Sequence, residues 1–135
     1  MTAKGFQKEL SAIKASQIDL HINSPGGVVF DGITIYNLLK NHSANVTTYI
    51  DGLAASIASV IALAGNKVIM AENALFMIHN PYGMVAGNAT EMRDFADKLD
   101  KVGGAIATTY ISKTGKTDVE IQAMLDAETW MTAAE

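Results

Sequence analysis

Cysteine is absent from the sequence, which excludes disulfides, thiolate catalysis and zinc sites built on cysteine. Clusters of lysine and arginine are also absent, and the formal net charge of −4 argues against a nucleic-acid-binding surface. The longest apolar run, residues 57–64, is far shorter than the ~20 residues of a membrane-spanning helix. The first residues lack the basic and apolar pattern of a signal peptide. These absences predict a soluble, mildly acidic protein that binds neither nucleic acid nor membrane, compatible with the cytoplasm.

Motifs for metal and phosphate binding are missing as well. The chain has no His-x-x-x-His pair, no carboxylates clustered with a histidine and no EF-hand pattern. The glycine-rich segment 83–87 lacks the Gly-Lys-Ser/Thr ending of a P-loop. We therefore expect no metal site and no cofactor.

The residue pattern alternates between strands and helices. With 49% hydrophobic residues, the chain has enough apolar side chains for the core of a single domain over residues 1–135. Alternating elements imply an α/β fold with a mostly parallel sheet. We expect helices at residues 3–14, 30–40, 57–64, 88–112 and 117–125, and strands at residues 18–22, 46–50, 67–70 and 74–78.

Capping patterns mark several helix starts. Asn88 with Glu91, and Thr117 with Glu120, have the spacing of a capping box. Thr132 with Glu135 has the same spacing, but no helix follows. We therefore expect the sequence to be a fragment that ends where another helix begins.

Three unusual features follow predicted strands. Gly26-Gly27 follows the first strand, Ser56 follows the second, and His79 follows a later one. Because binding sites in parallel α/β sheets lie at the carboxyl ends of the strands, we expect these residues to converge on one site.

Ser56 is the candidate nucleophile. It lies in the stretch 51–59, between a predicted strand and a predicted helix, where the first helical N–H groups have no intrahelical partner. A serine at this place could attack a carbonyl while amides of its own loop stabilise the oxyanion. The alternative is that the small residues of this stretch only allow a helix to pack closely against a sheet.

His79 is the preferred base among three histidines. His21 shares a polar strand face with Asp19, and His42 falls in a polar connection, so both are interpreted as surface residues. Asp126 is the candidate orienting acid, because a carboxylate at a helix C-terminus is disfavoured by the dipole and suggests another partner. The candidate oxyanion donors are the amides of Ile57 and Gly27.

Three blocks of residues, 23–27, 52–56 and 77–81, resemble in order the signature blocks of the Clp protease proteolytic subunit family. The similarity extends from about Ile18 to the end of the sequence. It implies a crotonase-like α/β fold with repeated β-α units and a protruding handle helix from about Asn88. It also implies seven-membered rings that stack face to face, and a possible AAA+ unfoldase partner.

The resemblance also assigns roles to residues. Ser56 becomes the nucleophile and His79 the general base, with Gly27 and Ile57 supplying the oxyanion amides. The segment before the handle would form a strand that binds an extended polypeptide by β-augmentation, with Gly26, Gly83, Met84 and Val85 as substrate-binding residues.

The C-terminal residues depart from the family pattern. In the family an Asp precedes an aromatic-Leu-Ser-Ala stretch, which reads Trp130-Met131-Thr132-Ala133 in this sequence, and two deleted residues bring Asp126 to the acid position. The position after the nucleophile is commonly Met and is Ile57 in this chain. No counterpart of the family's N-terminal axial hairpin precedes Thr2. The sequence of residues 126–133 resembles that of Clp-like proteases of phages and prophages. This resemblance favours a role in the processing of capsid or scaffold proteins.

Other hypotheses remain at this point. A housekeeping Clp subunit working with an unfoldase shares the same residues. A crotonase-fold acyl-CoA enzyme would use a similar pair of amides but would leave Ser56 and His79 unexplained. A Ser–Lys peptidase would need Lys40 or Lys67 beside Ser56, and an inactive ring-forming scaffold would need no triad.

Overall fold

A computed structural model describes residues 1–135. The helices are α1 (Ala3–Ala12), α2 (Val29–Lys40), α3 (Ile57–Ala62), α4 (Ala89–Thr114) and α5 (Asp118–Asp126). The strands are β1 (Gln17–Ser24), β2 (Asn45–Ala55), β3 (Lys67–Met70), β4 (Leu75–Ile78) and β5 (Thr129–Met131). The mixed α/β class predicted from the sequence is confirmed.

The long strand β2 organises the sheet. β1 pairs with it in parallel along one edge, from Gln17↔Asn45 to Ser24↔Ala54. On the other edge, β3 pairs with residues 47–50 and β4 with residues 53–55, both in parallel. β5 then pairs antiparallel with β4. β2 is therefore longer than the predicted strand, and its last residue, Ala55, immediately precedes Ser56.

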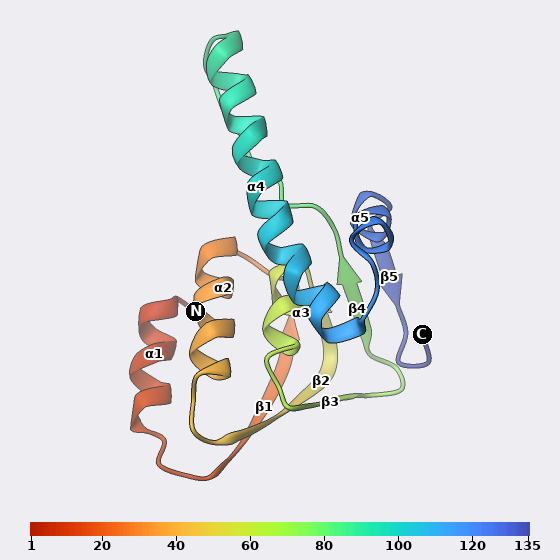
Figure 1. Cartoon of the computed structure of the whole chain (residues 1–135). Coiled ribbons are helices and arrows are strands. Elements are labelled where there is room, and N and C mark those ends of the chain that lie inside the picture. Colours follow the sequence, from red (N-terminus) through yellow and green to blue (C-terminus); the bar gives the residue numbers. More distant parts are fainter.

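Helices cover one face of the sheet (Figure 1). α3 packs on β1 and β2 through a cluster that includes Ile22, Ile50 and Ala58. α2 packs against α3 so closely that a Cβ on Gly32 would lie 2.1 Å from Ile57 Cγ1. The opposite face of β1 and β2 carries polar side chains, among them the hydrogen-bonded pair His21 and Asp51 at 2.9 Å.

The helix α4 has two unlike halves. Its N-terminal half extends beyond the rest of the molecule, with mostly exposed side chains (Figure 1). Its C-terminal half packs on α3 and α5 through Ile106, Ala107 and Tyr110. The capping boxes predicted at Asn88 and Thr117 are both present. None of the helices is both long enough and apolar enough to span a membrane.

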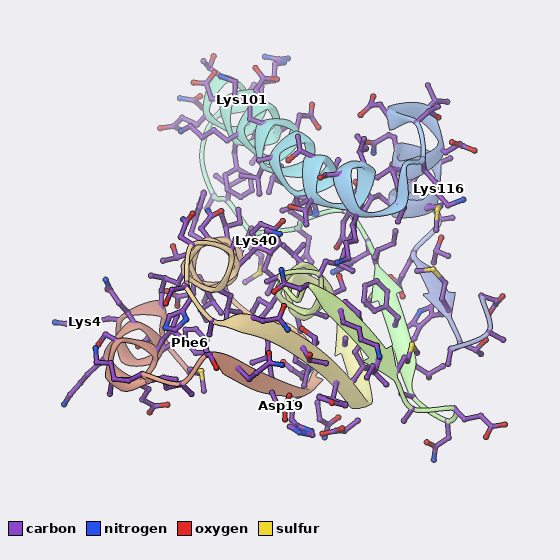
Figure 2. All side chains as sticks on the ribbon, turned by 60° about the horizontal axis from the view of Figure 1, so that its bottom comes forward. Lys4, Phe6, Asp19, Lys40, Lys101 and Lys116 are labelled. Carbon is purple, nitrogen blue, oxygen red and sulfur yellow. The ribbon has the colours of Figure 1, made fainter.

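Basic side chains are spread over the surface. Figure 2 shows Lys4 on α1, Lys101 on α4 and Lys116 after α4 at widely separated points of the molecule. The fold therefore does not gather these lysines into one positive surface.

Candidate active site

Ser56 occupies the sharp turn between β2 and α3. Its backbone has φ 54° and ψ −132°, a conformation that non-glycine residues rarely adopt. Its N–H donates to the carbonyl oxygen of Met77 on β4 at 3.0 Å. The strand pairing Ala55↔Met77 therefore continues into the turn and fixes the position of the serine.

Gly26 allows the neighbouring loop to approach this turn. Its φ is 105°, and a Cβ at this position would lie 2.7 Å from Ser56 Cβ and 2.9 Å from the Ala55 carbonyl oxygen. Both values are shorter than real Cβ contacts, so only glycine fits. The loop that contains Gly26 and Gly27 therefore lies directly against the nucleophile candidate.

His79 follows β4 and reaches the serine. Its Nε2 lies 2.8 Å from Ser56 Oγ, within hydrogen-bonding distance, and the residue is only partly exposed. If Nε2 accepts the serine proton, the ring proton is on Nδ1, where a carboxylate could bind it. The ring of Tyr82 lies beside the imidazole, with centroids 5.9 Å apart.

Ser56, His79 and Tyr82 line an open cleft of about 410 Å³. It combines residues of the loop after β1, the Ser56 turn and the end of β4, so Ser56 can be reached from solvent. Its lining residues are Pro25, Gly27, Val29, Ser56, Met77, His79, Pro81 and Tyr82.

The predicted substrate-binding segment differs from expectation. Residues 79–88 contain no strand. A Cβ on Gly83 would lie 2.7 Å from the ring of Phe95, so this part of the segment packs along α4. Gly83, Met84 and Val85 do not line the cleft, and Met84 is 97% exposed. The segment contains glycines and lacks the alternation of apolar and polar residues that is typical of a strand. The prediction of a substrate-binding strand in this segment is therefore wrong for this chain.

Asp126 contacts the loop after His79 rather than the imidazole. Its Oδ1 accepts hydrogen bonds from Asn80 Nδ2 at 2.7 Å and from Gln122 Nε2 at 2.8 Å. These two bonds, Asn80 first, hold the pKa of the Asp126 carboxyl below its usual value. No hydrogen bond joins Asp126 to His79 in the structure. The serine and histidine are brought together, but the expected acid is bonded elsewhere.

Glu128 is a second carboxylate to consider, and it lies directly before β5, where the sequence did not single it out. Thr129 pairs with Ile78, so Glu128 and His79 are the residues that flank the end of the β4–β5 pairing. Glu128 itself lies in a turn, where its N–H donates to the Leu125 carbonyl oxygen at 3.2 Å. Its Oε1 accepts from Trp130 Nε1 at 3.3 Å, and Trp130 pairs with Met77, which lines the cleft.

Backbone strain also marks Glu128. Its φ is 48°, and it shares a positive φ with only one other non-glycine residue, Ser56. Strained residues of this kind gather at functional sites. The available sequence signal was the Glu-Thr-Trp-Met stretch, a carboxylate directly before a short β-prone run.

The fold and the Ser–His contact define a class of protein. A serine on a strained strand-to-helix turn, hydrogen-bonded to a histidine at the end of a neighbouring strand, has the geometry of a serine hydrolase. A family model described as Clp protease matches residues 3–135, and the chain belongs to this family.

Curated relatives carry matching names. The chain is 36% identical to "ATP-dependent Clp protease proteolytic subunit 1" of Protochlamydia amoebophila, over 84% of this chain and 57% of the relative. It is 34% identical to "ATP-dependent Clp protease proteolytic subunit" of Porphyromonas gingivalis, over 99% and 63%, and of Bacteroides fragilis, over 99% and 68%. The chain thus spans about three-fifths of the length of these relatives.

Proposed function

We propose that this chain is the peptidase domain of a serine endopeptidase of the Clp type. The observation that carries the proposal is the 2.8 Å contact between Ser56 Oγ and His79 Nε2, at a strained turn that faces an open cleft. The family membership and the names of the relatives agree with it.

The proposed reaction begins with proton transfer from Ser56 Oγ to His79 Nε2 as Oγ bonds to the peptide carbonyl carbon. The carbonyl oxygen becomes an oxyanion, for which the backbone N–H groups of Gly27 and Ile57 are the donors. The imidazolium then gives its proton to the leaving amine, and the C–N bond breaks to leave an acyl-enzyme. Water then gives a proton to His79 as its oxygen adds to the ester carbonyl. His79 returns this proton to Ser56 Oγ as the acyl–Oγ bond breaks, which releases the acid and restores the serine.

Two carboxylates are candidates for orienting His79. Asp126 is implied by the resemblance, and Glu128 is favoured by its place at the end of the β4–β5 pairing, next to the pair Ile78 and Thr129, and by its positive φ. We assign Glu128 to the Nδ1 side of His79. Asp126 would act one step away, by holding the side chain of Asn80, the residue that follows His79.

The substrate class that fits the cleft is an extended polypeptide. The relatives' names contain "ATP-dependent", which supports a partner ATPase, in the form of an AAA+ unfoldase. We further propose a homo-oligomer, with seven-membered rings that stack through the projecting half of α4 as a handle. Tyr82 is 82% exposed, Met84 97% and Met92 48%, which supports subunit contacts in this region. The assembly would work in the bacterial cytoplasm.

A phage or prophage processing role is the narrower form of the proposal. It depends only on the amino-acid sequence of residues 126–133, whereas the relatives named above are bacterial proteins named as ATP-dependent Clp protease subunits. Cleavage assays on an unstructured protein with and without an unfoldase would separate the two roles, because a processing protease needs no ATP to cut an accessible site.

A fluorophosphonate probe tests the proposal directly. Assembled wild-type protein should be labelled at Ser56, and Ser56→Ala and His79→Ala should both abolish labelling. His42→Ala is a matched control, because the His42 ring only accepts a hydrogen bond from the Ala44 N–H at 3.0 Å. If assembled wild-type protein is not labelled, the peptidase proposal fails and the ring-forming scaffold takes its place.

A further inference from the structure

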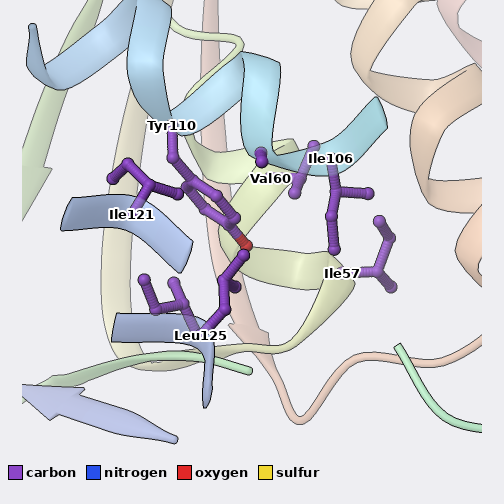
Figure 3. Packing of buried hydrophobic residues seen from close by; sticks show 8 residues of the cluster. Ile57, Val60, Ile106, Tyr110, Ile121 and Leu125 are labelled. Atoms are coloured by element: carbon purple, nitrogen blue, oxygen red, sulfur yellow. The ribbon is translucent and has the colours of Figure 1, made fainter. Parts of the chain in front are cut away.

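Two buried hydroxyl groups lie behind the nucleophile turn. Ser59, on α3, has no exposed surface, and Tyr110, on α4, is 3% exposed. The Tyr110 hydroxyl lies 2.7 Å from Ser59 Oγ. Figure 3 shows Tyr110 reaching inward from α4 between Ile106, Ile121 and Leu125, with its oxygen directed toward α3. Burying two hydroxyls is costly unless both are hydrogen-bonded, so this pair is a built feature of the core.

The direction of these hydrogen bonds can be assigned. Ser59 Oγ donates to the carbonyl oxygen of Ser56, which can only accept. A serine hydroxyl has one proton, so the Tyr110 hydroxyl must donate to Ser59 Oγ. Burial raises the pKa of Tyr110 to about 12, so its hydroxyl keeps the proton it donates across the working pH range. The result is a chain of donors from α4 through α3 to the Ser56 carbonyl.

The Ser56 carbonyl belongs to the same peptide group as the Ile57 N–H. In a trans peptide the C=O and N–H bonds point in opposite directions. The Ser56 carbonyl oxygen also accepts from the Ser59 N–H at 2.9 Å, so it is held from the inner side by two donors of one residue. A carbonyl fixed inward turns the Ile57 N–H outward, toward the serine side of the turn.

We propose that Ser59 and Tyr110 are positioning residues that fix the Ser56–Ile57 peptide group and so orient the Ile57 N–H as an oxyanion donor. The inference rests on the proposed peptidase function and adds to it a link from the long helix to the oxyanion hole. The backbone of Ser56 is strained, and a strained peptide group rotates unless its surroundings hold it. The hydrogen bonds from Ser59 and Tyr110 supply that restraint.

The test uses Tyr110→Phe, Ser59→Ala and the double variant. Thr48→Val is a matched control, because Thr48 has a fully buried hydroxyl without a hydrogen-bond partner, on β2. Loss of a whole oxyanion donor costs about 10²–10³-fold in kcat, so a donor that is only misaligned should cost about 10-fold or more. We expect this loss of kcat for Ser59→Ala, a smaller one for Tyr110→Phe, and KM within about twofold of wild type. The double variant should match Ser59→Ala, because both changes break one chain.

A second readout separates positioning from folding. The affinity of a peptide aldehyde, whose adduct occupies the oxyanion site, should fall in parallel with kcat, while Thr48→Val changes neither. Variants that unfold at lower temperature but keep wild-type kcat and aldehyde affinity would overturn the inference.

Failure of the peptidase proposal gives a different pattern. If wild-type protein neither cleaves peptides nor binds the aldehyde, hydrogen exchange of the peptide covering residues 54–60 still reports on the turn. Exchange should accelerate in Tyr110→Phe and Ser59→Ala but not in Thr48→Val. Equal exchange in all four proteins contradicts the positioning role.

Discussion

Gly26 lies against Ser56 so closely that a Cβ on the glycine would be 2.7 Å from the Cβ of the serine. The contact joins the loop after β1 to the turn after β2, and it holds the loop that contains Gly27 beside Ser56. Because the positive φ of Gly26 also disfavours any side chain, the loop cannot accept alanine without moving.

Gly26→Ala should therefore abolish peptidase activity while leaving most of the fold intact. The added methyl group pushes the loop that carries Gly27, the proposed oxyanion donor, away from the turn, so the expected loss of kcat is about 10²–10³-fold, the range for a missing oxyanion donor. Fluorogenic peptide cleavage measures the loss. Gly104→Ala is the matched control, since a Cβ there has no neighbour within 4 Å. Wild-type activity in Gly26→Ala would show that the loop does not contribute to catalysis.

Replacing the two candidate carboxylates, Glu128 and Asp126, distinguishes their proposed roles. Glu128→Gln should lower kcat by about 10²–10⁴-fold, because an amide no longer stabilises the imidazolium or selects its tautomer. Asp126→Asn should reduce kcat only a few-fold, because an amide oxygen can still accept from Asn80 and Gln122. The pH profile of kcat/KM should change in Glu128→Gln alone. The reverse ranking of the two variants would return the orienting role to Asp126.

The sequence predicted the parts of the site that depend on strand ends. Ser56 and His79 each follow a run of strand-forming residues, and parallel strands bring their carboxyl ends to one edge. The capping boxes at Asn88 and Thr117 could also be predicted, because the residues of each box are only three positions apart in the sequence. These are local patterns combined with one general rule of topology.

The acid could not be predicted in the same way. β5 has three residues, Thr129–Met131, too few for a periodic signal, so its antiparallel pairing with β4 could not be predicted. The chain Tyr110–Ser59–Ser56 was also hidden, because its members are 51 and 3 residues apart in sequence and meet only through packing of α4 on α3. Side-chain contacts of this range require the folded structure.

Acid should loosen the C-terminal segment first. Hydrogen bonds from Thr117 lower the pKa of Glu120 from its usual 4.5, and those from Asn80 and Gln122 lower that of Asp126 from 3.8. A carboxyl whose pKa is lower in the folded state stabilises fully above its unfolded pKa, and this stabilisation is lost as the pH falls through the folded pKa. Stability should thus be constant above about pH 5 and decline below pH 4.

Trp130 provides the readout, because it is the sole tryptophan and lies on β5. Its fluorescence should change below pH 4, before the helical circular dichroism signal falls. Glu120→Ala should unfold at lower temperature than wild type at pH 7, and the difference should shrink at pH 3. A difference that is the same at both pH values would exclude the carboxylate as its cause.

Alanine at two helical glycines should have opposite effects on stability. A Cβ on Gly32 would overlap Ile57 Cγ1 at 2.1 Å, so Gly32→Ala forces α2 away from α3 and should destabilise by about 1–3 kcal/mol, the usual cost of overpacking. Gly104 is exposed in the middle of α4 and a Cβ there meets nothing, so Gly104→Ala should stabilise by about 0.5–1 kcal/mol. Urea unfolding monitored by circular dichroism measures both changes.

Because Ile57 also carries the proposed oxyanion amide, Gly32→Ala should lower kcat as well, whereas Gly104→Ala should not. A Gly32→Ala protein that is destabilised but fully active would show that the α2–α3 contact supports the fold without shaping the oxyanion hole.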